Sequence, residues 1–453
     1  MITKARTATL GSLALSLAAT GAMAQDLTHS APAQDHAVFI TGGTVHTVSG
    51  ETIEDGVVAF NEGRITIVGD RATVMSRISL SQDTEIIDAS GKHVYPGLIA
   101  PATRLGLTEI NAVRAMRDYN EVGEFTPEVR AAVSVNPDST LIPVARSNGI
   151  LLFGTFPAGG RIPGRASVMR ADGWTWEDMA ADDSAGMVIN WPAVRPRHQR
   201  FAGDTSRKDR QKEIKKQLDE LNDFFDGAEA YIDATAADES HATDLRYEAM
   251  RAFLADEDPK PVFINANDAD QITSAVTWSI GRGLRPVIVG GRDALSVSDL
   301  LVTNNVPVIL RGTHVFPKRT DSAYDDAYTT PARLQAAGVS WCLDSADRDG
   351  NVRNLPYEAA RAAAYGLDPA VALRSITLSS AEILGIADDY GSLESGKSAT
   401  LIVTDADCLE VTSNVELAFI DGKRIDISNK QTKLRDKYRD KYQQLELIEQ
   451  DND

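Results

Sequence analysis

Several polar residues lie at or just beyond the ends of short apolar runs in the middle of this chain. They include Arg104, Asn265, Asn267 and Asp344. The carboxyl ends of parallel strands meet at one end of a barrel, so we expect these side chains to converge. Guanidinium, amide and carboxyl groups together suit the recognition of a carboxylate or amide by paired hydrogen bonds. Asp344 is the candidate catalytic residue, and the candidate ligand-binding residues are Arg104, Glu109, Arg114, Asn265, Asn267, Arg353 and Asn354.

The same residues also fit a structural network with no ligand. An unpaired buried charge is costly, so Arg104 is expected to neutralise Asp344, directly or through water. Asn265 and Asn267 are two residues apart and project to the same side of a strand, which favours a lining role for both. The sequence leaves the binding site and the structural network open as alternatives.

The elements that would position these residues alternate between short apolar runs and helical patterns. This alternation is typical of β/α units with a parallel sheet, and a TIM-like barrel accounts for so many strands better than an open sheet does. The fold class is therefore α/β. The predicted strands are Leu98–Ala102, Ile150–Phe156, Met187–Asn190, Val262–Ala266, Pro286–Val289, Val306–Leu310 and Ser340–Asp344.

Outside this central region the pattern changes. Val38–His46 begins a series of short β-rich runs separated by turn signals, and similar runs return after residue 390. A helix is predicted over Lys208–Ala230, with one apolar stripe. The last segment carries apolar residues at helical spacing and is predicted to be a docked helix. That stripe consists of Leu434, Tyr438, Tyr442 and Leu445.

The stretch Pro96-Gly97-Leu98-Ile99-Ala100 resembles the strand that opens the barrel of the amidohydrolase superfamily, in its exported, imidazolonepropionase-like branch. The resemblance covers essentially residues 38–440. It implies that the two β-rich ends join into one small β-sandwich beside the barrel. The expected divisions are 1–24 leader, 25–37 flexible tail, 38–95 with 390–427 composite β-sandwich, 96–389 barrel and 428–453 C-terminal helix.

The resemblance also implies a divalent metal such as zinc, held by imidazoles and carboxylates at the ends of the barrel strands. This sequence replaces the expected imidazoles. Ala102 and Arg104 stand at the first pair of positions, and Asn265 and Gly290 stand at the next two. Only Asp344 keeps a carboxylate. The prediction is therefore that no metal cofactor is bound here.

Two further features belong to the same end of the barrel. His314 follows a predicted strand, where it could line the mouth or simply be a loop histidine bonded to backbone or water. Asn351–Tyr357 resembles a stretch that recurs in the exported branch, and this resemblance is what makes Arg353 and Asn354 candidates.

Residues 1–24 have the pattern of a secretory leader. Lys4 and Arg6 are followed by an apolar segment, and Ala22-Met23-Ala24 fits the small-x-small cleavage rule, so we expect export to the periplasm with Gln25 first. The formal net charge of the chain is −19, which disfavours nucleic acid as a partner, and no segment suits membrane insertion. The two cysteines, 342 and 408, lie in separate predicted segments, so two buried free thiols are expected rather than a disulfide.

Two functions follow as hypotheses. The first is an exported hydrolase acting on a non-peptide carbon–nitrogen bond, in a cyclic amide or amide-like small molecule, with an altered metal site. The second is a catalytically inactive barrel that binds a small polar molecule or a partner chain, either a second copy or a paralogue. Fold resemblance alone does not decide between them.

Overall fold

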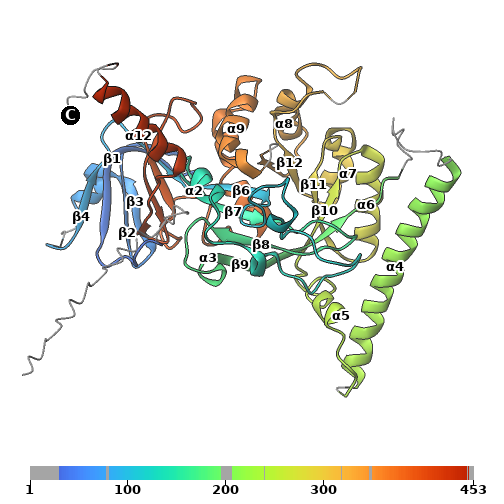
Figure 1. The fold of residues 1–453 in the computed structure, drawn as a ribbon. Helices are drawn as coiled ribbons and strands as arrows, with labels where there is room; N and C mark the ends of the chain where they lie inside the picture. The colour runs from blue at the N-terminus through green and yellow to red at the C-terminus, as the bar shows by residue number, and fades with distance from the viewer. Residues whose placement is uncertain are drawn as a thin grey trace, which may run out of the picture.

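The computed structural model describes residues 30–77, 81–194, 207–238, 240–317, 319–345, 349–445 and 447. Two sheets dominate this part of the chain. One is a composite sheet beside helix α12, and the other is the barrel that occupies the centre (Figure 1). The predicted leader, residues 1–24, lies outside the described residues.

The barrel sheet has eight strands, hydrogen-bonded in the order β13-β12-β11-β10-β9-β8-β7-β6. The seven strands predicted from the sequence are all present and run parallel to one another. Most are continuous apolar runs, because strands covered on both faces have no exposed side to make polar. The strands are β6 (Leu98–Thr103), β7 (Ile150–Thr155), β8 (Gly164–Arg170), β9 (Ala180–Asn190), β10 (Pro261–Ala266), β11 (Arg285–Gly290), β12 (Val308–Arg311) and β13 (Trp341–Asp344).

The eighth strand, β8, was not predicted. It lies antiparallel between β7 and β9, so the chain returns through the sheet as a hairpin instead of crossing over through a helix. The first and last strands of the sheet are joined through a side chain, because the Ala102 N–H donates to Asp344 Oδ1 at 3.3 Å. The architecture is a TIM-like barrel in which one strand is reversed.

Helices surround the barrel and cover its outer face (Figure 1). The predicted helix over Lys208–Ala230 is confirmed within the longer α4, whose Leu221 and Phe225 are fully buried. The helices are α1 (Arg71–Met75), α2 (Leu141–Arg146), α3 (Trp176–Met179), α4 (Arg207–Ala237), α5 (Leu245–Met250), α6 (Ala269–Gly281), α7 (Ser298–Thr303), α8 (Asp326–Ala336), α9 (Leu355–Ala364), α10 (Pro369–Ser375), α11 (Leu378–Leu384) and α12 (Lys430–Gln444).

The composite sheet joins the two ends of the chain, as the sequence resemblance implied. Strand β5 pairs in parallel with β1 from the N-terminal segment and antiparallel with β14 from the C-terminal segment. Residues from both segments then enclose a separate core that includes Val45, Phe60, Leu401 and Phe419. Its strands are β1 (Val38–His46), β2 (Thr52–Asn61), β3 (Arg64–Asp70), β4 (Glu85–Asp88), β5 (His93–Pro96), β14 (Leu401–Thr404), β15 (Val415–Ile420) and β16 (Lys423–Arg424).

Two terminal segments differ from what the sequence suggested. Residues 25–37 were expected to be a flexible tail. In the described part, 30–37, the Ser30 hydroxyl donates to Asp172 at 2.8 Å and the Gln34 amide donates to the Phe60 carbonyl at 3.2 Å. Helix α12 forms, but it is not docked. Leu434, Tyr438 and Tyr442 are each more than 40% exposed, and no residue of the helix is buried, whereas its N-terminal cap, Asn429, is.

Two expectations about the whole chain can be compared with the structure. Cys342 and Cys408 are both buried and free, so the prediction of two unpaired thiols is confirmed. Within the described residues, no helix is long and apolar enough to cross a membrane.

Candidate functional site

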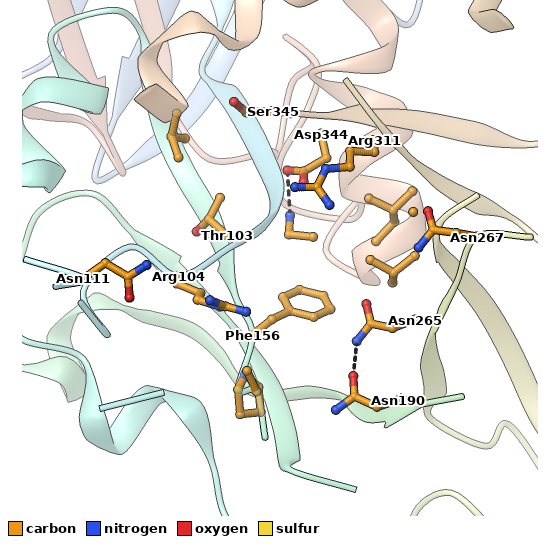
Figure 2. Close-up of a pocket in the computed structure, with 17 residues that line it drawn as sticks. Thr103, Arg104, Asn111, Phe156, Asn190, Asn265, Asn267, Arg311, Asp344 and Ser345 are labelled. Atoms are coloured by element: carbon orange, nitrogen blue, oxygen red, sulfur yellow. Dashed lines mark hydrogen bonds between the residues drawn. The ribbon is translucent and has the colours of Figure 1, made fainter. Parts of the chain in front are cut away.

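A cavity of about 430 Å³ opens at the carboxyl ends of the barrel strands (Figure 2). Of the predicted site residues, Arg104, Asn265, Asn267 and Asp344 line it. Each comes from a different place at the mouth, after β6, at the end of β10, just beyond β10, and at the end of β13. The other lining residues are Ala102, Thr103, Asn111, Phe156, Pro157, Ala158, Asn190, Val289, Gly290, Ile309, Arg311, Ser345 and Val352.

Asp344 is the only carboxylate that lines this cavity among the described residues. It is 9% exposed, and burial raises its pKa from 3.8 to about 8. The Ala102 and Ser345 N–H groups and the Arg311 guanidinium oppose that shift by favouring the ionised form. At neutral pH the Asp344 carboxyl therefore carries its proton and can donate a hydrogen bond.

The predicted pairing of Arg104 with Asp344 is wrong. The Arg104 guanidinium lies over the Tyr119 ring, 4.4 Å from its centroid, and Tyr119 in turn donates to Asn111 at 3.2 Å. Figure 2 shows Arg311, rather than Arg104, beside Asp344. An aromatic ring attracts a guanidinium less strongly than a carboxylate does. The Arg104 side chain also lines the cavity.

The amide of Asn265 is fixed from the opposite wall. It donates to Asn190 Oδ1 at 2.8 Å, and Asn190 in turn donates to the carbonyl oxygens of Gly159 and Gly160 at 2.7 and 2.8 Å. The carbonyl groups of the glycine-rich segment 156–164 thus hold Asn190 in place. Asn265, Asn190 and the loop 156–164 are thus linked by hydrogen bonds along one polar side of the cavity.

Asn267 occupies space that a side chain at Gly290 would need. Gly290 has φ +102°, and a Cβ placed there would lie 2.7 Å from Asn267 Oδ1. A residue other than glycine is strained at such a φ, whatever the surrounding space. Position 290 is thus committed to glycine by both its backbone and its neighbour.

Four predicted residues do not line this cavity. Glu109 accepts hydrogen bonds from the Thr140 backbone N–H at 3.2 Å and hydroxyl at 3.0 Å, and so holds a neighbouring loop. Arg114 is exposed on a short 3-10 helix. The Arg353 guanidinium donates to the Gly350 carbonyl at 2.8 Å, and Asn354 is the N-terminal cap of α9. All four come several residues after a barrel strand in the sequence. There the path of the connecting segment, rather than the direction of the strand, decides where a side chain lies.

Three lining residues were missed although a signal existed. Asn190 ends the predicted strand Met187–Asn190, Phe156 ends Ile150–Phe156, and Arg311 directly follows Val306–Leu310. The rule that identified Asn265 and Asp344 would have identified them too. Asn111 gave no such signal, because it lies in a loop.

His314 does not line this cavity but a neighbouring one. Its backbone N–H donates to Glu358 Oε2 at 2.6 Å, and its ring Nδ1 lies 3.5 Å from Glu358 Oε1. The sequence left two alternatives for His314, a residue that lines the mouth or a loop histidine. The structure places it in a loop, with its ring beside the Glu358 carboxylate.

Comparison with known proteins connects this arrangement to a family. A model of the amidohydrolase family matches residues 205–425. The crystal structure of an amidohydrolase from Thermotoga maritima MSB8 superposes with a TM-score of 0.74 at 24% identity, covering 86% of this chain and 99% of that one. Residues 205–425 of this chain therefore resemble the amidohydrolase family. Its barrel and composite sheet share the fold of that crystal structure.

Two relatives illustrate the similarity of this chain in sequence. Amidohydrolase tasK from Hapsidospora irregularis is 24% identical over 434 residues, which are 85% of this chain and 42% of that protein. Imidazolonepropionase from Halobacterium salinarum is 43% identical over 53 residues, 12% of this chain and 13% of that protein. The chain spans less than half the length of either relative.

The residues that line the barrel mouth do not fit a divalent metal. Structural and catalytic zinc sites need three or four good donors, and the described residues contain no group of three His, Cys, Asp or Glu side chains that could hold a metal. Two guanidinium groups, Arg104 and Arg311, line the cavity beside the single carboxyl. Their positive charge opposes a cation at this place.

Proposed function

We propose that the barrel mouth binds a small molecule bearing a carboxylate and an amide, and that it does so without a resident divalent metal. The proposal rests on one observation above all. Arg104, Arg311 and the protonated Asp344 line one cavity, and all three are hydrogen-bond donors at neutral pH. Such a set is complementary to the oxygens of an anion.

The charge balance of the cavity supports a negative ligand. With Asp344 neutral, the described lining residues carry two guanidinium groups and no ionised carboxylate. Guanidinium groups bind carboxylates through parallel hydrogen bonds, which are roughly twice as strong as those between neutral groups. An acidic small molecule would therefore find a preformed site, even though the chain as a whole is acidic.

The asparagines that line the cavity favour a ligand that also carries an amide group. Asn265 uses its NH₂ group on Asn190, so its carbonyl oxygen is directed to accept from a ligand N–H. Asn267 supplies a second amide on the same side of the cavity. Amide groups of this kind fix the orientation of a ligand more than they add to its affinity.

Binding of N-acetylglycine, which carries both groups, tests the proposal. We expect saturable binding by isothermal calorimetry on the full chain at neutral pH. Replacing Arg311→Gln removes a charged donor and should weaken binding about tenfold or more. Arg435→Gln, on the exposed helix α12, is the control and should have no effect. Absence of saturable binding at millimolar concentration would refute the proposal.

Hydrolysis of a non-peptide carbon–nitrogen bond is the second candidate function. It is favoured by the pKa of Asp344, about 8, which lies near the pH at which a group transfers protons efficiently. Ionised Asp344 would take a proton from water as its oxygen attacks the carbonyl, and would return it to the leaving nitrogen. Cleavage of N-acetylglycine or a lactam that increases through pH 8, and that Asp344→Asn abolishes, would establish this reaction. No cleavage at any pH would leave binding alone.

We also propose that the protein is exported and acts in the periplasm. The support is the sequence of residues 1–24, with its basic start, apolar middle and Ala22-Met23-Ala24 ending. N-terminal sequencing of the protein from the periplasmic fraction should begin at Gln25. Full-length protein confined to the cytoplasm would contradict this assignment.

A further inference from the structure

A second cavity of about 450 Å³ adjoins the first one at the barrel mouth. The two cavities share three lining residues, Asn267, Gly290 and Arg311. Each lies within the size range of small-molecule sites, about 300–1,000 Å³, and so does their combined volume. Their contiguity means that one molecule could occupy both.

The second cavity differs from the first in chemistry. It lies between the segment 312–317, which follows β12, and helix α8. Apolar side chains form much of its wall, namely Leu310, Val315, Phe316, Pro317 and Ala327. Phe316 is 94% exposed, so a large aromatic surface stands in water where an apolar ligand could cover it.

Apart from Arg311, the charged residues around the second cavity form ion pairs within the protein. Arg292 forms ion pairs with Asp268 and Asp293, and Asp326 lies 3.4 Å from Arg333. His314 lies beside Glu358. These pairs leave the apolar side chains as the surface that a ligand would remove from water, which is the main source of affinity in such a pocket.

Gly290 lies at the junction of the two cavities. Any side chain there would project toward Asn267, which borders both cavities, and would stand between them.

We propose that the two cavities form one site for an amphiphilic molecule. Its carboxylate and amide occupy the first cavity, and an acyl chain or other apolar group passes Gly290 into the second. This inference rests on the proposed function of the first cavity and adds the apolar part of the ligand. Arg311, which lines both cavities, is placed to contact the ligand where its polar part ends.

A chain-length series tests the second cavity. N-acetyl-, N-butanoyl-, N-hexanoyl- and N-octanoylglycine share one head group and differ in apolar length. Burying a methylene group yields about a three- to fourfold gain in affinity, so calorimetric affinity should rise along the series until the cavity is full. The longer compounds should also protect Phe316 from solvent.

Two variants on one helix localise the effect. Ala327→Phe fills the second cavity and should abolish the gain from chain length while leaving N-acetylglycine binding unchanged. Ala336→Phe makes the same change at an exposed position of α8 and should leave the whole series unchanged. Phe316→Ser, at a nearly fully exposed position, should reduce the gain without filling the cavity, and it remains informative if Ala327→Phe does not fold.

The outcomes separate this inference from the function on which it rests. If no member of the series binds, the first cavity does not have its proposed function. If N-acetylglycine binds but longer chains gain nothing, the second cavity is not a subsite. A gain that persists in both Ala327→Phe and Phe316→Ser would likewise overturn the inference, because the apolar part would then bind elsewhere.

Discussion

The wall of this barrel, meaning the buried part of its strands, and the mouth at their carboxyl ends are made from the same strands. They differ in the physical demands on each side chain, which are close packing in the wall and hydrogen bonding or charge balance at the mouth. In the wall, Val262, Phe263 and Ile264 of β10 are fully buried. At the mouth, the next residue of the same strand is Asn265, which faces a polar cavity and bonds to Asn190. A single step along the strand passes from the packed core to a surface that contacts solvent or ligand.

The difference shows at which positions of this fold a substitution does not disturb the packing of the core. Wall residues must fill a close-packed interior, where even a methylene group matters. Mouth residues must only satisfy their own hydrogen bonds and charges. Arg104 over Tyr119 and Asn267 beside Gly290 do this without a metal. Packing therefore constrains the wall, whereas hydrogen bonding and charge constrain the mouth.

The largest expected effect concerns the wall. Phe153 on β7 is fully buried, so Phe153→Ala should lower the free energy of unfolding by about 3–5 kcal/mol. At the mouth, Asn265→Ala removes one hydrogen bond and should cost about 1 kcal/mol. Chemical denaturation of both variants measures the comparison. Equal losses would show that the mouth is as tightly constrained as the wall.

The next effect concerns the buried carboxyl. The pKa of Asp344 is about 8 in the folded chain and near 3.8 when exposed, so between these values only the folded state holds the proton. The contribution of Asp344 to stability is therefore full below pH 4 and is lost as the pH rises toward 8. We expect the unfolding free energy to fall by ~1.4 kcal/mol per pH unit from this group between about pH 5 and 7.

Asp344→Asn should lack this component of the pH dependence, because an amide does not titrate. Subtracting its denaturation profile from that of the wild type isolates the contribution of one carboxyl. Parallel profiles from pH 5 to 8 would mean that Asp344 is ionised throughout, and the donor role assigned to it would be lost.

A smaller effect distinguishes two glycines. Gly290→Ala places a Cβ at positive φ and against Asn267, which should cost roughly 1–3 kcal/mol. Gly281→Ala, at the end of α6 with open space around it, should be neutral or stabilising by about 0.5–1 kcal/mol. Thermal unfolding of the two variants compares them directly. If Gly290→Ala unfolds at the wild-type temperature, the reason for glycine at the junction of the cavities is removed.

The smallest effect concerns the two possible partners of Arg104. A double-mutant cycle between Arg104→Leu and Tyr119→Leu should give a coupling of about 0.5–1 kcal/mol, as expected for a cation over an aromatic ring. The corresponding cycle with Asp344→Asn should give a coupling near zero. A larger coupling energy between Arg104 and Asp344 than between Arg104 and Tyr119 would show an ion pair that the structure does not contain.

Much of the wall could be predicted from the sequence, because buried parallel strands leave continuous apolar runs such as Ile150–Phe153. The composite sheet followed from the resemblance, since its two halves lie more than 300 residues apart in the chain. Strand β8 was missed because it enters as a hairpin after a glycine- and proline-rich stretch that reads as a loop.

The mouth could be predicted only in part. Asn265 and Asp344 were placed correctly because they end strands, and strand direction fixes where their side chains lie. Glu109 and Arg114 were misplaced because they lie in a loop whose path depends on contacts such as that between Glu109 and Thr140. The partner of Arg104 depends on side-chain orientation around Tyr119, which spacing along the chain does not encode.

Binding with and without zinc tests the central claim most directly. The full chain would be purified, its metal content measured by mass spectrometry, and N-acetylglycine titrated before chelator treatment, after it, and after incubation with zinc. We expect less than one equivalent of tightly bound metal and the same affinity in all three states. Two equivalents of tightly held zinc, with binding or hydrolysis that disappears on chelation and returns on reloading, would contradict the account.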